Sequence, residues 1–413
     1  LLATKIVSRA SQVFEVHLTV RALFEFPTVK ELATNIVELI AGGEKKEIIS
    51  ALSREAIASK EVRVPLSFAQ QRLWLLDKID EGSTAYNVPL AMRIKGNLNV
   101  EQLESTLTAL MQRHEGLRTV FKEDEEGAYQ WLMAADEFSL MQSNVVNEGA
   151  IRNAVANEIL QPFDLESGPL IRASLLSVGN EKVGSEGAND YVLVIVAHHI
   201  VTDGWSMNIL GQELATLYVT SSMGLESPLD EPQLQYIDYS QWQRNRLYGE
   251  AFSKHLSYWE NTLEGLPNLN LPTDFQRPSV QSYAGASVKF ELPQDVRNKL
   301  ESIAHSNGGT LFNALMAAFG VLLSRYTGQD DFAIGTPVAG RDHPDLEKIV
   351  GFFVNTLVVR LRLESVDRFD SLVKAVNESV VSGQEHQEIP FEQIVDTVDP
   401  TRDMSRSPLF QAM

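Results

Sequence analysis

The sequence predicts a mixed α/β (α+β) fold in two similar halves, preceded by a small helical segment. Short apolar runs typical of strands alternate with helical patterns from residue 90 onward. Residues 1–43 show helical patterns without strand-like runs. Because a chain of 413 residues is too long for one ordinary hydrophobic core, we expect two or three domains.

Two helices and a linker are expected at the N-terminus. Apolar side chains repeat with helical spacing over residues 1–14, and a second helical pattern over residues 29–40 is bounded by Pro27 and Gly42. Residues 44–62 are polar and charged, as in interdomain linkers, and their alanines and isoleucines favour a short helix. This linker would span at most about 60 Å when fully extended and about 25 Å as a flexible coil.

The first α/β half follows the linker. Its expected elements are, in order, strand 90–94, helix 100–114, strands 118–122 and 129–133, helix 151–159, strands 171–177 and 191–197, and helix 206–218. The apolar run at 191–196 has no polar alternation, so we expect this strand to be buried on both faces. Ser206 is a suitable N-cap for the helix that follows.

The second half repeats this mixture of elements. Its expected elements are, in order, strand 286–292, helices 294–305 and 310–326, strands 332–337 and 357–363, and helix 371–384. Gly328 is placed to end the long apolar helix. Because both halves mix the same elements, we expect two similar lobes.

Composition excludes several classes of protein. With 55 acidic and 35 basic residues, the net charge of −20 argues against nonspecific binding to nucleic acid or anionic membranes. No apolar stretch is long enough to span a bilayer, and no signal-peptide pattern opens the chain. The absence of cysteine excludes disulfides and a thiol nucleophile. We therefore expect a cytoplasmic protein that acts on neither nucleic acid nor membranes.

Two adjacent histidines stand at the exit of the apolar strand 191–197. Residues 197–205 read Ala-His-His-Ile-Val-Thr-Asp-Gly-Trp. Neighbouring side chains of an extended chain point to opposite faces. One histidine can therefore pack inside while the other faces a cleft, and we expect His198 to be the structural one and His199 to face the cleft.

The pattern HHxxxDG, formed by His198, His199, Asp203 and Gly204, resembles the active-site motif of condensation domains from nonribosomal peptide synthetases. These domains are related to chloramphenicol acetyltransferase-like acyltransferases. Six further stretches resemble the family's other motifs in the family's order: 67–74, 113–119, 236–242, 349–357, 386–392 and 402–411. The resemblance implies two acetyltransferase-like lobes, 63–235 and a C-terminally truncated 236–413, in a V-shape with a central tunnel.

Residues 1–29 resemble the second half of a peptidyl carrier domain, whose expected extent here is 1–43. In that family the serine that bears phosphopantetheine immediately precedes a Leu-Leu pair. The resemblance thus places the attachment serine directly before Leu1 and implies 4'-phosphopantetheine as the covalent cofactor of the carrier domains.

The family resemblance implies peptide-bond formation. The amine of an acceptor aminoacyl thioester would attack a donor acyl or peptidyl thioester, both held on phosphopantetheine arms. The implied partners are an upstream carrier domain in the same chain and downstream adenylation and carrier domains. An epimerisation-type domain and a noncatalytic recruitment domain of the same fold are the alternatives. The intact histidine motif and the Asn355-Thr356 pair favour condensation.

Roles for the motif residues follow from this chemistry. His199 could accept the ammonium proton, orient the amine or stabilise the oxyanion, and the sequence does not choose among these. By resemblance, Asp203 forms an ion pair with Arg341, in preference to orienting His199. Gly204 either leaves room for the thioester arm or is a turn glycine.

A metal site is not expected. Adjacent histidines on an extended strand point apart, and the sequence contains neither an HExxH motif nor cysteine.

Overall fold

The computed structural model describes residues 2–16, 18, 22–23, 26, 28–42, 49–59, 62–135, 138–179, 189–246, 249–279, 285–364, 366–398, 403 and 405–413. The expected attachment point next to Leu1, part of the linker, and Arg402 and Met404 of the last motif lie outside the described residues. The chain divides into two compact units. Unit 1 comprises Leu1–Glu47, Leu247–Asp342 and Val354–Met413, and unit 2 comprises Ile48–Arg246 and His343–Phe353.

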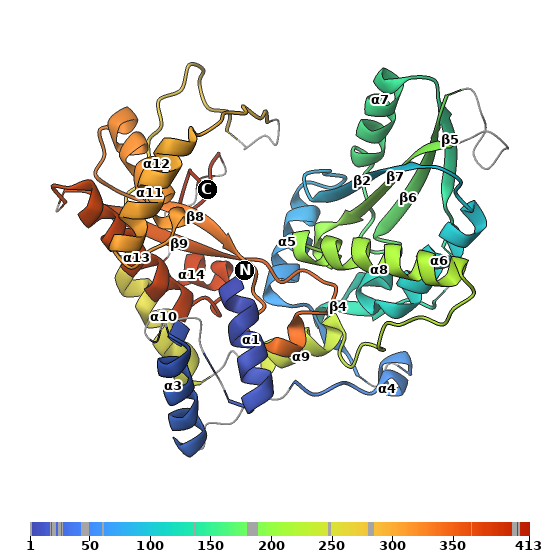
Figure 1. The fold of residues 1–413 in the computed structure, drawn as a ribbon, viewed down its shortest axis with the longest axis horizontal. Coiled ribbons are helices and arrows are strands. Elements are labelled where there is room, and N and C mark those ends of the chain that lie inside the picture. The colour runs from blue at the N-terminus through green and yellow to red at the C-terminus, as the bar shows by residue number, and fades with distance from the viewer. Residues whose placement is uncertain are drawn as a thin grey trace. The chain divides into compact units, whose positions relative to one another are not determined.

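Unit 2 contains a four-stranded sheet with the strand order β2-β7-β6-β5 (Figure 1). Its strands are β2 (Asn87–Lys95), β7 (Asp190–His198), β6 (Ile171–Val178) and β5 (Met141–Val145). β7 pairs antiparallel with both β2 and β6, and β5 pairs parallel with β6. The strand that leads to the two histidines is therefore held along both edges.

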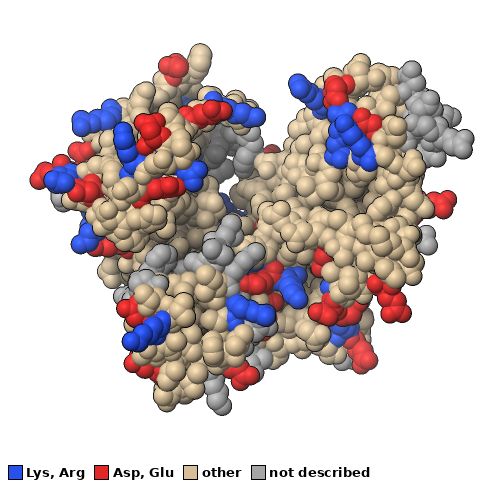
Figure 2. Space-filling model, viewed as in Figure 1, with Lys and Arg blue, Asp and Glu red and all other residues tan. Residues whose placement is uncertain are grey.

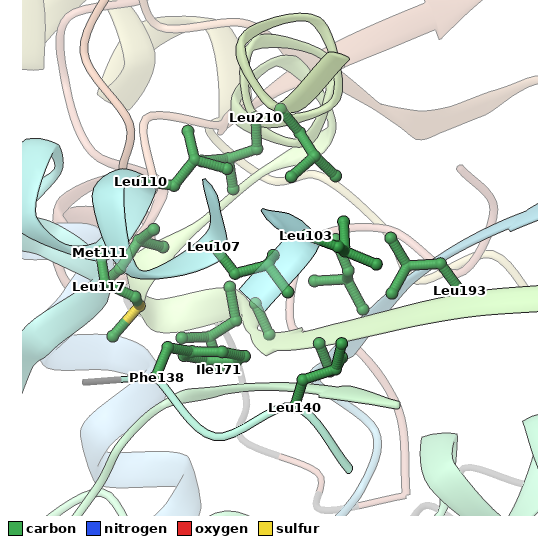
Figure 3. Packing of buried hydrophobic residues seen from close by; sticks show 14 of the residues in the cluster. Leu103, Leu107, Leu110, Met111, Leu117, Phe138, Leu140, Ile171, Leu193 and Leu210 are labelled. Atoms are coloured by element: carbon green, nitrogen blue, oxygen red, sulfur yellow. The ribbon is translucent and has the colours of Figure 1, made fainter. Parts of the chain in front are cut away.

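Helices cover both faces of this sheet. They are α6 (Val100–Arg113), α7 (Glu148–Ile159) and α8 (Gly204–Ser222). Leu193 of β7 packs in one cluster with α6 and α8, as Figure 3 shows, whereas Val194 packs in another cluster with α7. This cover on two sides buries every residue from Tyr191 to His198, which confirms the prediction from the unbroken apolar run.

A second sheet in unit 2 has the antiparallel order β1-β4-β3. Its strands are β1 (Val64–Pro65), β4 (Gly127–Leu132) and β3 (Thr119–Asp124). The unit also contains α5 (Phe68–Ile79), α9 (Tyr236–Arg246) and the short helices η1 (Glu115–Arg118), η2 (His199–Val201) and η3 (Pro344–Leu346). Ser67 and Gln70 form a capping box that starts α5, because each side chain bonds to the other's backbone N–H.

The described part of the linker is bound within unit 2. Its short helix α4 (Arg54–Ala58) confirms the predicted one. The Arg54 guanidinium donates to both oxygens of Asp238 at 2.8 and 2.7 Å and to Glu115 at 2.9 Å. Ile49, only 4% exposed, packs in a cluster with Tyr236. The described part of the linker is thus anchored from Ile49 onward.

Unit 1 contains the antiparallel pair β8 (Asp331–Val338) and β9 (Asn355–Arg362). Its helices are α10 (Glu250–Leu263), α11 (Gln294–Ser306), α12 (Leu311–Thr327), α13 (Phe369–Glu385) and α14 (Phe391–Val398). Ile334 packs with α11, α12 and α13, whereas Ala333 packs with α10 and α14. Gly328 ends α12 with a left-handed φ of 70°, as predicted.

The N-terminal helices α1 (Leu2–Phe14) and α3 (Val29–Gly42) confirm the predicted helical segment. They share a small core that includes Val7 and Ile36. At the start of α3, Thr28 and Glu31 bond to each other's backbone N–H groups, as in a capping box. Helices and sheets together confirm the mixed α/β class.

Two predicted details are wrong. Residues 286–292 form no strand, and Val288 and Phe290 are 89% and 86% exposed. Their alternating pattern marks a strand only where a neighbouring strand pairs with it, and no strand among the described residues does so. Helix α8 begins at Gly204 instead of after Ser206, because the Asp203 carboxylate accepts the Ser206 N–H and is the N-cap.

Within the described ranges, no single helix is long and apolar enough to cross a membrane, although the bent pair α11 and α12 satisfies that test together by length and composition. On the face shown in Figure 2, the coloured basic and acidic side chains are interspersed.

Candidate active site

His198 is held inside unit 2 at the end of β7. Its side chain is 2% exposed and lies edge-on to Phe163, with ring centroids 6.2 Å apart. Its Nδ1 accepts the Ile200 N–H at 3.1 Å, which fixes the ring orientation. Burial lowers the pKa of His198 to about 3, and the charge of neighbouring His199 adds to this shift. His198 is therefore a neutral imidazole at physiological pH.

His199 begins the short helix η2, where the chain leaves the extended conformation of β7. Its side chain is half-buried. Its Nδ1 lies 2.7 Å from the carbonyl oxygen of Thr202. Because a carbonyl only accepts, Nδ1 must carry the proton, and in the neutral ring Nε2 then carries the lone pair. Local backbone geometry thus leaves the Nε2 lone pair of His199 able to accept a hydrogen bond.

Asp203 is fully buried and bridges two segments of unit 2. Its Oδ1 accepts the Ser206 N–H at 2.7 Å, and its Oδ2 accepts the Phe353 N–H at 3.1 Å. The carboxylate therefore caps α8 and holds a segment 150 residues further along the chain. The His199 nitrogen that an orienting carboxylate would hold is bonded to the Thr202 carbonyl instead.

Residues 351–353 form what we call the clamped segment, because three of the chain's side chains hold its backbone. Ser206 Oγ donates to Gly351 O at 2.8 Å and accepts its N–H at 3.0 Å. The Tyr236 hydroxyl donates to Phe352 O at 2.5 Å, and Asp203 accepts the Phe353 N–H. Sequence reasoning missed this segment, although it lies in one of the recognised motif stretches.

The aromatic ring of Phe352 extends from the clamped segment to the candidate base. Its centroid lies 4.7 Å from that of the His199 imidazole, and the two ring planes are 60° apart.

Two glycines near the site differ in what surrounds them. A Cβ at Gly351 would stand 1.9 Å from Cδ2 of Tyr236, so only glycine fits there. At Gly204, the exposed first residue of α8, nothing lies within 4 Å of the place a Cβ would take. The fold therefore requires glycine at 351 but not at 204.

Arg341 is the remaining predicted site residue. It follows β8 in unit 1 and is fully buried, whereas Asp203 belongs to unit 2. The ion pair between them stays a prediction. Among the described residues, no group of three or more His, Asp or Glu side chains is placed to hold a metal ion.

Comparisons with known proteins agree with the motif pattern. The family model for the condensation domain matches residues 60–413, and the model for the phosphopantetheine attachment site matches residues 1–36. One of the linear gramicidin synthase proteins of Brevibacillus parabrevis is 42% identical over 422 residues, which cover the whole chain but 5% of that protein. A plipastatin synthase protein of Bacillus subtilis (strain 168) is 38% identical over 412 residues, again the whole chain but 15% of that protein. The chain thus spans a small part of these relatives.

Solved structures with the same fold include the X-domain from teicoplanin biosynthesis. It is 28% identical with a TM-score of 0.79, and the match covers 88% of this chain and 78% of that one. A four-domain nonribosomal peptide synthetase bound to AMP and glycine is 26% identical with a TM-score of 0.75, and the match covers 85% and 26% of the two chains. The acetyltransferase-like fold expected from the resemblance is thereby confirmed, and the chain belongs to the condensation domain family, with a match to the phosphopantetheine attachment site at residues 1–36.

Proposed function

We propose that this chain forms peptide bonds in nonribosomal peptide synthesis. The amine of an acceptor aminoacyl thioester attacks the carbonyl of a donor acyl or peptidyl thioester. The single observation that carries this proposal is the intact HHxxxDG motif, in which the half-buried His199 has its Nδ1 proton engaged and its Nε2 lone pair available.

The phosphopantetheine arm supplies the acyl group as a thioester, which is already activated for attack. One observation supports the fit of such an arm beside His199. Gly204 is exposed, and the space where its Cβ would stand is open to a distance of 4 Å. A slender chain can therefore approach the start of α8 without meeting a side chain at residue 204.

Holding both substrates in line supplies most of the acceleration, because orientation alone contributes ~7–11 kcal/mol. As the new C–N bond forms and the C–S bond breaks, the attacking nitrogen must lose a proton. His199 Nε2 accepts it, and the Thr202 carbonyl, bonded to Nδ1–H, stabilises the resulting imidazolium. The imidazolium then gives the proton to the thiolate that leaves with the donor arm, so a thiol is released and His199 is neutral again. The neutral His198 beside it adds no opposing positive charge.

This geometry favours proton acceptance over stabilisation of the oxyanion by His199, and the assay below separates proton acceptance from orientation of the amine. A stabiliser of the oxyanion needs a proton on Nε2 as well as on Nδ1, whereas an acceptor needs only the tautomer that the Thr202 carbonyl selects. We assign His199 as the proton acceptor and His198 as its neutral structural neighbour.

The upstream carrier domain of the same chain is the proposed source of the donor, and downstream adenylation and carrier domains supply the acceptor. The matched attachment-site model at residues 1–36 supports the upstream partner. We also propose a cytoplasmic location, in keeping with a chain that contains no cysteine.

A noncatalytic role is the competing proposal. The X-domain from teicoplanin biosynthesis was solved in complex with OxyB, so a protein of this fold can act as a binding partner. The complete histidine motif in this chain favours catalysis, and one assay separates the two.

Donor and acceptor carriers are loaded with their amino acids, and the dipeptidyl product on the acceptor carrier is measured by mass spectrometry. We expect product with the native chain and a rate about 10²–10⁴-fold lower with His199→Ala, while thermal stability and carrier affinity stay nearly unchanged. Carrier binding without any product would support the recruitment role instead. A rate that barely falls would make His199 an orienting contact.

A further inference from the structure

We propose that Phe352 is a positioning residue for His199, and that Asp203, Ser206 and Tyr236 act on the imidazole by holding the clamped segment. This inference rests on the proposed function of His199 as proton acceptor. In this proposal Asp203 acts by holding the Phe353 N–H, so its role requires neither an ion pair nor contact with His199.

The clamp leaves the backbone of residues 351–353 little freedom. Four of its polar groups are bonded: Gly351 N–H and O to Ser206, Phe352 O to Tyr236, and Phe353 N–H to Asp203. Tyr236 is only 1% exposed, and its hydroxyl also lies 2.8 Å from Ser67 Oγ. Buried, fully bonded groups of this kind are costly to displace.

A fixed backbone fixes the position from which the Phe352 side chain extends. Its ring also packs partly against the buried cluster that contains Ile200 and Val201, the two residues after His199. The ring thus meets both the imidazole and the turn that carries it, and its edge-to-face geometry with His199 is an arrangement that aromatic pairs favour.

The imidazole needs this second contact. Its hydrogen bond to Thr202 O fixes one ring nitrogen, but a single bond still permits the ring plane to tilt and Nε2 to swing. A ring 4.7 Å away limits that tilt and therefore the direction in which the Nε2 lone pair points. Proton transfer depends steeply on such alignment.

The first test replaces the ring. Phe352→Leu keeps an apolar side chain but removes the aromatic edge, and Phe352→Tyr keeps the ring. As matched control, Phe121→Leu makes the same change at a fully buried ring of the same cluster. Nitrogen-15 chemical shifts of labelled histidine report the tautomer of His199. Its signals are identified by their loss in His199→Ala. Product formation gives kcat and KM.

Without the Phe352 ring the imidazole can tilt away from Thr202 O, which weakens the hydrogen bond that selects the tautomer. We therefore expect Phe352→Leu to mix the two tautomers of His199 and to lower kcat about tenfold with KM nearly unchanged. Phe352→Tyr should restore both readouts, and Phe121→Leu should lower the melting temperature without altering either. Native tautomer and kcat in Phe352→Leu, or the same losses in Phe121→Leu, would overturn the proposal. If the native chain forms no product, the proposed function fails, while the tautomer measurement still decides the positioning role.

The second test removes the anchor. Tyr236→Phe deletes the hydroxyl that holds Phe352 O, and Tyr239→Phe deletes a neighbouring hydroxyl that accepts from Gln243. We expect Tyr236→Phe to change the His199 tautomer and kcat in the same direction as Phe352→Leu. Tyr239→Phe should leave both unchanged. Equal effects of the two variants would show that the clamp does not act on His199.

Discussion

At the scale of single residues, two identical side chains in sequence have different chemistry because their surroundings differ. His198 ends a strand covered on both faces, and burial keeps its pKa near 3. His199 starts a turn, stays half-buried and donates from Nδ1 to a backbone carbonyl. One is suited to packing and the other to proton transfer.

The low pKa of His198 predicts acid-sensitive stability. Below pH 6.5 the unfolded chain protonates this histidine, whereas the folded chain does so only near pH 3. The neutral His198 therefore makes its full contribution to the free energy of unfolding above pH 6.5, and this contribution is lost as the pH falls towards 3. The loss amounts to about 3 kcal/mol by pH 4. In His198→Asn the amide oxygen can still accept the Ile200 N–H but does not titrate. Urea unfolding of both proteins between pH 7.5 and 4 should show the native chain losing more stability, and parallel curves would refute the low pKa.

The predicted ion pair of Asp203 and Arg341 is tested by a double-mutant cycle. Both side chains are fully buried. Loss of one partner of a buried pair costs about 3–5 kcal/mol, so Asp203→Asn and Arg341→Ala should each destabilise the protein, and the double variant should lose less than their sum. Unfolding free energies of the four proteins measure this. Strict additivity would mean that Asp203 stabilises the protein through Ser206 and Phe353 alone.

At the scale of elements, the site is the junction of β7, the start of α8 and the clamped segment. β7 delivers the histidines, and Asp203 caps α8 while holding Phe353. The clamped segment can lie against Tyr236 of α9 because Gly351 has no side chain that would overlap the ring.

The two glycines at this junction provide a matched pair of variants. Gly351→Ala should destabilise the protein by about 1–3 kcal/mol or more, because its Cβ would overlap the Tyr236 ring. Gly204→Ala should leave stability unchanged or slightly raised, since alanine suits a helix and meets nothing within 4 Å. Urea unfolding measures the stability of both variants. The rate of product formation by Gly204→Ala should fall if the thioester arm passes beside residue 204. A native rate would identify Gly204 as a plain turn glycine.

At the scale of the whole molecule, the anchored linker sets how far the carrier can reach. Since Arg54 and Ile49 are bound to unit 2, only residues 43–48 join α3 to that anchor. Six residues span at most about 25 Å even when fully extended, which is less than half the fully extended length of the whole linker.

The short tether predicts which carrier delivers the donor. In a chain extended to include a complete upstream carrier domain, single-turnover reactions should give product when the donor is loaded upstream and not when it is loaded downstream. Ile49→Ser combined with Arg54→Ala would remove both anchors, lengthen the tether about threefold and lower the upstream rate about fivefold, because effective concentration falls roughly as the −3/2 power of length. A donor carrier supplied as a separate protein should react equally with both chains. Product only from downstream loading would overturn the assignment.

Periodicity and motif spacing determined much of this protein by sequence alone. The unbroken apolar run of β7, the helical stripe of α1 and the glycine that ends α12 each report local burial or local backbone conformation, which neighbouring residues suffice to specify. The histidine motif lies within seven consecutive residues, so its recognition needed no tertiary contact.

Tertiary structure alone decided what those residues touch. A pattern of apolar residues suggests that a segment is buried, but it does not show which distant segment covers it. Residues 286–292 have the pattern of a strand, yet no described strand pairs with them and their apolar side chains are exposed. The bond from Asp203 to the Phe353 N–H joins residues 150 apart, and a backbone donor leaves no trace in the sequence. For the same reason the Thr202 carbonyl that sets the His199 tautomer, and the clamp that places Phe352 against its ring, became visible only once the chain was folded.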